Sequence, residues 1–174
     1  KFRRCSKQAL PPSLPVKNIK KETIMSGLYY EEFEVGSEFK HALTRTITEM
    51  DNVMFCAMTH NPQPLHLDEE FSKKTMYGQR IVNSLFTLGL VIGVTVADTT
   101  LGTTLGNLGM GDIRFKHPVF HGDTVNVITR IKDKRESKSR PNEGIVTFEH
   151  VGYNQRGEEI AYVIRTGLMK KKPA

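Results

Sequence analysis

The segment at residues 59–68 concentrates side chains that can move protons or hold water. It reads Thr-His-Asn-Pro-Gln-Pro-Leu-His-Leu-Asp, so that His66 follows Asn61 and precedes Asp68 at short intervals. An imidazole exchanges protons near neutrality, whereas a carboxamide can hold water by two hydrogen bonds but does not ionise. The two prolines predict an extended polar loop. His66 is therefore either a proton-transfer group or a loop histidine bonded to a backbone carbonyl, and Asp68 either faces the same side or caps a short helical turn at 68–74.

A second polar group stands at the start of the most apolar stretch, residues 81–97. Arg80 precedes that stretch, and Asn83 and Ser84 lie in its first residues. The amino end of a helix carries free N–H groups and favours negative charge, so backbone amides around Ser84 are candidates for stabilising an anion. Arg80 either meets an anionic ligand or forms a salt bridge. Asn83 either contacts a ligand or caps the helix.

The spacing of apolar residues predicts two helices, which must position these side chains. Apolar residues recur at helical spacing over residues 47–59, behind a possible capping box at Thr48, which predicts an amphipathic helix with the stripe from Met50 to Met58 in the core. Residues 81–97 are apolar on almost every side of a helical wheel, so that helix must be enclosed. Its two glycines, Gly89 and Gly93, would let another backbone come close.

Alternating patterns in the second half of the chain predict strands at 112–116, 124–131, 145–153 and 160–168, with a hairpin turn at 154–157 and a polar loop at 135–143. The glycine-rich residues 102–111 form either a strand with bulges or a flap over a ligand. A fully apolar helix is hidden by such a meander only if the sheet curls around it. The predicted fold is therefore α+β, a single hot-dog domain in which a curved antiparallel sheet wraps a long buried central helix. Its free sheet edge predicts at least a homodimer.

Length, charge and cysteine content narrow the class of protein. The chain has 174 residues and a net charge of +6, but residues 1–22 hold seven bases and one acid, and the rest hold 18 of each. The folded part is thus neutral, which argues against nucleic-acid binding.

No apolar run is long enough to cross a membrane. Two cysteines predict neither a disulfide framework nor a zinc site, and a reducing compartment, the cytoplasm, fits best. The basic, proline-containing arm at 1–26 is either a mitochondrial targeting segment or upstream sequence, and 171–174 form a tail.

Three segments carry a resemblance to a known family. They read QPLHLD at 63–68, YGQRIVNS at 77–84 and FKHPVFHGD at 115–123. In this order they resemble the MaoC-like dehydratases, the (R)-specific enoyl-CoA hydratase family, over residues 27–170. Within the family the chain is most similar to members that act on mesaconyl-CoA and methylmalyl-CoA.

The resemblance implies a hot-dog dimer that adds water to a trans-2-enoyl thioester or removes it from a 3-hydroxyacyl thioester. The family's catalytic loop usually reads Asp-x-Asn-Pro-(Ile/Leu)-His. Asn61 stands here in place of the aspartate and Gln63 in place of the asparagine, while His66 is retained. The family's His-Gly pair at the start of the central helix corresponds to Asn83 and Ser84.

The expected activity is reversible hydration of a short, branched or dicarboxylic enoyl-CoA. His66 would carry out both proton transfers in sequence, Asn61 would orient the water, and the Ser84 N–H would stabilise the enolate oxygen. The second proton-transfer group could instead be Asp68. Substrate contacts are expected from Gln63, Arg80 and Asn83.

The CoA thioester is expected to be the substrate, and we expect no cofactor, metal, nucleic acid or membrane partner. The alternative functions are a non-catalytic subunit that binds acyl thioesters after losing its aspartate, and an acyl-CoA thioesterase, because the same fold also hosts that reaction.

Overall fold

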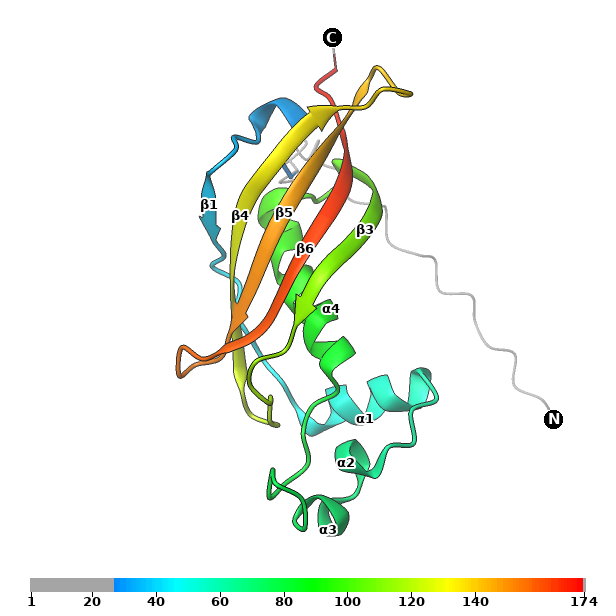
Figure 1. Cartoon of the computed structure of the whole chain (residues 1–174), viewed down its shortest axis with the longest axis vertical. Coiled ribbons are helices and arrows are strands. Elements are labelled where there is room, and N and C mark those ends of the chain that lie inside the picture. Colours follow the sequence, from blue (N-terminus) through cyan, green and yellow to red (C-terminus); the bar gives the residue numbers. More distant parts are fainter. Residues whose placement is uncertain (1–26, 174) are drawn as a thin grey trace, which may run out of the picture.

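A computed structural model describes residues 27–173 and shows one antiparallel sheet with helices at one side and one end (Figure 1). The long strands are β3 (Thr104–Arg114), β4 (Thr124–Glu136), β5 (Glu143–Tyr153) and β6 (Glu159–Lys170). With β1 (Glu38–Lys40) they follow the order β1-β4-β5-β6-β3, and β2 (Arg45–Thr46) pairs with β4. A short 3-10 helix, η1 (Tyr30–Glu32), precedes β1. The sequence patterns did not predict the elements before residue 47.

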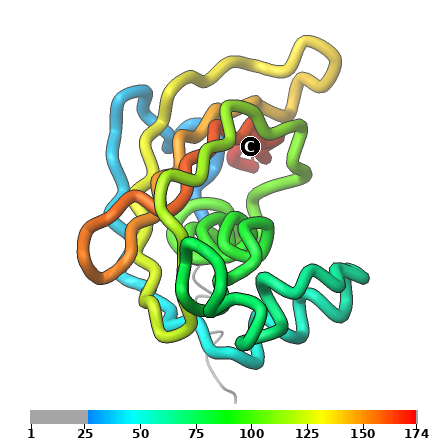
Figure 2. Tube along the Cα trace, turned by 60° about the horizontal axis from the view of Figure 1, so that its bottom comes forward, coloured from blue at the N-terminus to red at the C-terminus, as the bar shows by residue number. Residues whose placement is uncertain are grey.

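The central helix, α4 (Ser84–Thr99), lies against one face of this sheet (Figures 1 and 2). Alternate residues of β4 from Val125 to Ile131 are buried on one face of the sheet, as the alternation predicted. Val91 and Val94 of α4 join Val125 in the main apolar cluster. The predicted α+β class and hot-dog arrangement are thus confirmed in the way the sheet and helix pack.

Three shorter helices gather at the amino end of α4 (Figure 1). They are α1 (Glu49–Met58), α2 (Pro64–Leu67) and α3 (Glu69–Ser72). α1 begins with the predicted capping box, since Thr48 accepts from the Asp51 N–H and the Asp51 carboxylate accepts from the Thr48 N–H. Asp68 caps α3 by accepting from the Phe71 N–H, which is the second of its two expected roles. These helices build the end of the molecule where the candidate site residues lie.

The prediction that α4 is enclosed on all sides is wrong for the single chain. The Leu85 side chain is 62% exposed, and a methyl group added at Gly89 or Gly93 would meet nothing within 4 Å. The sheet covers only the opposite side of the helix, which carries Thr87, Val91 and Val94. A single curved sheet therefore leaves one apolar face of the central helix open.

The prediction that the methionine stripe of α1 is core is also wrong. Met50 is 69% exposed and Met58 is 70% exposed, whereas Asn52 and Cys56 are the buried residues of this helix. Periodicity identified an apolar face correctly, but the helix packs on its own chain through another face.

The remaining predictions differ mainly at boundaries. The 59–68 segment is not wholly extended, because Pro64 starts α2 at the first helical position, where the missing N–H costs nothing. Residues 102–111 contain most of β3, a strand with register shifts against β6, and the polar loop shortens to residues 137–142. The turn at 154–157 is confirmed, with Gly157 at φ +79°.

The arm at 1–26 lies outside the described residues. Among residues 27–173, no helix is long and apolar enough to cross a membrane.

Candidate active site

His66 lies on α2 and is held by the chain that leads into α4. Its Nδ1 donates a hydrogen bond to the Ile81 carbonyl at 2.9 Å. A carbonyl only accepts, so Nδ1 carries the hydrogen, and Nε2 of the neutral ring is an acceptor. Within residues 27–173, no hydrogen bond to Nε2 is found. The structure thus shows the expected hydrogen bond of His66 to a backbone carbonyl, and proton transfer by Nε2 stays a prediction.

Asn61 lies in the loop between α1 and α2, three residues after the end of α1. Its Oδ1 accepts from the Gln63 N–H at 3.1 Å, which closes a local turn. The residue lines an open groove of about 440 Å³ together with Val53, Cys56, Ala57, His60, Pro62 and Leu67. Neither His66 nor Ser84 lines this groove, so a single chain does not bring Asn61 and Ser84 into one cavity.

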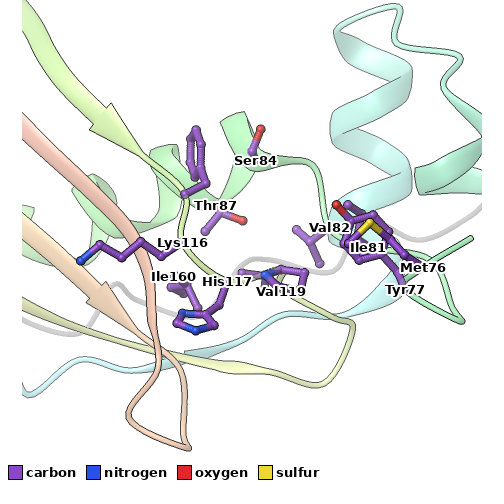
Figure 3. Close-up of a pocket in the computed structure, with 12 residues that line it drawn as sticks. Met76, Tyr77, Ile81, Val82, Ser84, Thr87, Lys116, His117, Val119 and Ile160 are labelled. Carbon is purple, nitrogen blue, oxygen red and sulfur yellow. The ribbon is translucent and has the colours of Figure 1, made fainter.

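Ser84 is the first residue of α4 and lines a separate pocket of about 360 Å³ (Figure 3). Ser84 and Thr87 project from the helix, and His117 and Val119 approach from the segment between β3 and β4. In the part of the chain that the structure describes, no group accepts from the Ser84 N–H. Ile81 also lines this pocket, and its carbonyl accepts from His66, which is not itself among the lining residues.

Arg80 is satisfied by two carboxylates of the same chain. Its Nη1 lies 2.6 Å from Glu49 Oε1 and its Nε 3.0 Å from Glu69 Oε2, with the side chain 17% exposed. The hydrogen bond and the charge of Arg80 lower the pKa of Glu49. The salt-bridge alternative therefore holds, and it joins α1, α3 and the turn before α4. Contact of Arg80 with substrate stays a prediction.

Asn83 caps α4, which is one of the two roles left open for it. Its Oδ1 accepts from the Leu85 N–H at 3.0 Å, and its side chain is buried. This side chain is therefore turned into the helix end rather than toward the pocket. Gln63 is exposed at the start of α2, and it lines neither of the two cavities described above. Substrate contact by Gln63 stays a prediction.

The sequence patterns missed several residues that the fold places here. Asn52 of α1 is fully buried and contacts both the His66 segment and the start of α4. His121 accepts from Asn52 at Nε2, and burial followed by the Arg80 charge lowers its pKa. His117 donates from Nδ1 to the Glu159 carbonyl and lines the Ser84 pocket. His117 and His121 lie in the motif at 115–123, whereas no sequence pattern singled out Asn52.

The sheet, the central helix and the pocket at its amino end define a hot-dog domain. A family model described as "MaoC like domain" matches residues 32–154. The match covers most of the chain, so the chain belongs to the MaoC-like domain family. The resemblance inferred from the three sequence segments is thereby confirmed.

Relatives with named activities align with most of this chain. The mesaconyl-CoA hydratase of Cereibacter sphaeroides is 28% identical over 147 residues, 84% of this chain and 42% of that protein. The β-methylmalyl-CoA dehydratase of Chloroflexus aurantiacus is 30% identical over 146 residues, 84% of this chain and 41% of that protein. The chain thus spans less than half the length of these two relatives.

Solved structures show the same fold. A MaoC-like dehydratase from Rhodospirillum rubrum superposes with a TM-score of 0.73 at 27% identity, covering 85% of this chain and 100% of that one. A Mycobacterium tuberculosis protein described as having a double hotdog fold superposes with a TM-score of 0.76 at 18% identity, over 84% of this chain and 45% of that one. The second likeness concerns the fold alone.

Proposed function

We propose that this protein reversibly hydrates a short enoyl-CoA thioester, with a branched or dicarboxylic acyl group as the preferred substrate. Family membership and the two named relatives support the reaction class, and the relatives' names support the acyl group. The observation that carries the proposal is the His66 ring, whose Nδ1 donates to the Ile81 carbonyl and whose Nε2 is left as an acceptor.

In this proposal His66 Nε2 takes a proton from water while the water oxygen bonds to the β-carbon of the enoyl thioester. The electron pair of the double bond moves toward the thioester carbonyl and forms an enolate, which the Ser84 N–H stabilises. His66 then returns the proton to the α-carbon, so the reaction is balanced without a second ionisable group. Asn61 orients the water. The 16-residue α4 presents its positive amino end to the enolate oxygen.

The proposal includes a second copy of the chain across the open face. β3 is an edge strand that is paired within the described chain only with β6, and Leu108, Met110 and Ile113 are exposed along it. Leu85 is exposed on the adjoining open face of α4. An edge strand with exposed apolar side chains favours pairing with another chain. A homodimer would cover this surface.

The first test mixes the purified protein with crotonyl-CoA and, separately, mesaconyl-CoA. We would follow loss of the enoyl thioester absorbance and release of free thiol in parallel. We expect absorbance loss without thiol release, reduced about 100-fold or more in His66→Ala. Lys74→Ala is the matched control, because Lys74 is an exposed residue just after α3 that lines neither cavity, and it should retain activity.

A specific observation favours one alternative, the non-catalytic acyl-thioester-binding subunit. The Asn61 Oδ1 is occupied by the Gln63 N–H, and Asn61 lines a groove other than the Ser84 pocket. Binding of acyl-CoA with no change in either signal would support that function and refute hydration of these substrates. Thiol release would instead identify a thioesterase.

A further inference from the structure

Asn52 is a buried amide at the junction of α1, α2, the start of α4 and the segment that carries His121. It lies in the middle of α1 with 0% of its surface exposed. Its Nδ2 donates to the His66 carbonyl at 3.1 Å and to His121 Nε2 at 3.1 Å. Its Oδ1 accepts from the Asn83 N–H at 2.9 Å. One side chain thus joins segments that lie 14, 31 and 69 positions away in the sequence.

These partners fix the orientation of the amide. The Asn83 N–H can only donate, so it must face Oδ1, and the His66 carbonyl can only accept, so it must face Nδ2. The two Nδ2 hydrogens are then used by His66 and His121, with the Ile81 carbonyl at 3.5 Å as a longer third contact. An aspartate would lose both donors, and a leucine would lose every hydrogen bond while leaving buried partners unsatisfied.

Asn52 holds two main-chain groups, one in the residue proposed to transfer the proton and one beside the residue proposed to stabilise the enolate. One is the carbonyl of His66 itself, and the other is the N–H of Asn83, the residue before Ser84. We propose that Asn52 is a positioning residue, which sets the separation of the His66 imidazole from the Ser84 N–H. This inference rests on the proposed hydration and identifies a residue that acts through His66 rather than on the substrate.

His121 is part of the same arrangement. Because its Nε2 accepts from Asn52, the neutral ring carries its hydrogen on Nδ1. The positive charge of Arg80 lowers the pKa of this ring, while the charges of Glu49 and Glu69 raise it. A protonated His121 would present an N–H to the Asn52 amino group and break the contact. His121 therefore supports the amide only in its neutral form.

The test is a double-mutant cycle on hydration rates with Asn52→Ala, His66→Ala and the double variant. Misplacing a catalytic group by about 1 Å costs about 100-fold in rate, so Asn52→Ala should lower kcat on that order with a smaller change in KM. If Asn52 acts through His66, the double variant should be no slower than His66→Ala. Independent, multiplying losses would overturn the inference.

Asn154→Ala is the matched control for lost stability. Asn154 is also a buried asparagine, and its amide bonds to Glu158 and to the Arg156 N–H in the turn between β5 and β6. It should destabilise the fold without lowering kcat. An equal loss of kcat in Asn154→Ala and Asn52→Ala would mean that Asn52 is only structural.

A second pair of variants keeps the inference testable if Asn52→Ala does not fold. His121→Gln retains an acceptor for Asn52 and should keep kcat within about threefold, whereas His121→Leu removes it and should lower kcat about tenfold. Unchanged kcat in His121→Leu would overturn the inference. Failure of the proposed function looks different, since the wild-type protein would then hydrate neither substrate.

Discussion

His150 on β5 supplies a prediction about stability against pH. It is 0% exposed, its Nδ1 donates to Thr129 Oγ1 at 2.8 Å, and its Nε2 accepts from Arg165 Nε at 3.1 Å. Burial, followed by the charge of Arg165, lowers the pKa of His150 to about 3. Both ring nitrogens are used by the neutral ring, so a proton added to Nε2 would break the contact with Arg165.

The sign and size follow from linkage between protonation and folding. The pKa of a histidine in the unfolded chain is about 6.5, so between about pH 6.5 and about pH 3 the unfolded state binds a proton that the folded state does not. The His150 contribution is therefore complete above about pH 6.5 and declines as the pH falls. Between about pH 7.5 and about pH 5 the free energy of unfolding should decrease by about 2 kcal/mol from this residue.

The measurement is urea unfolding followed by far-ultraviolet circular dichroism at several pH values, since the chain has no tryptophan. His150→Gln is the comparison, because an amide can accept from Arg165 and donate to Thr129 but does not titrate. The wild-type advantage over His150→Gln should shrink by about 2 kcal/mol across that pH range. A constant advantage would refute the reasoning, because it would mean that His150 titrates in the folded protein much as it does in the unfolded chain.

Three further predictions concern packing, capping and assembly. A methyl group at Gly144 would overlap the Tyr30 ring, so Gly144→Ala should cost about 1–3 kcal/mol in thermal or urea unfolding. Thr48→Ala removes the cap of α1 and should cost about 1 kcal/mol, while activity at a temperature well below unfolding is retained. Met110→Asp places a charge on the exposed apolar edge of β3 and should shift the sedimentation coefficient from dimer to monomer.

The assembly prediction has an internal control. Val35 is also an exposed apolar residue, but it lies before β1, at the opposite end of the strand order from β3. Val35→Asp should leave the sedimentation coefficient unchanged. A Met110→Asp protein that sediments like the wild type would contradict pairing through β3.

The features that the sequence predicted correctly depend on neighbouring residues. The Thr48 capping box, the turn ending at Gly157 and the inward alternation of β4 each arise from contacts within a few positions. Boundaries moved where a single side chain intervened. α4 begins at Ser84 rather than earlier because Asn83 caps it, and α2 begins at Pro64 because proline is tolerated at the first helical position.

The errors arose where a pattern identified a face without identifying what covers it. Met50 and Met58 share an apolar stripe, yet α1 packs on its own chain through Asn52 and Cys56. The prediction for α4 was wrong for the same reason, because the periodicity of apolar residues does not show whether the surface that covers a helix belongs to the same chain. Asn52 was missed for this reason, because it occupied a position that the stripe marked as outward.

The sequence by itself determined the strand alternation, the helix starts, the neutral charge of the folded part and, through three motifs, the family and the candidate histidine. Only the tertiary structure decided that Arg80 pairs with Glu49 and Glu69, that Asn61 and Ser84 line separate cavities, and that Asn52 joins His66 to the start of α4. Local rules act over a few residues and are written in the order of the chain. Hydrogen bonds and ion pairs between distant segments exist only after the sheet and helices have packed, so their partners are set by the fold.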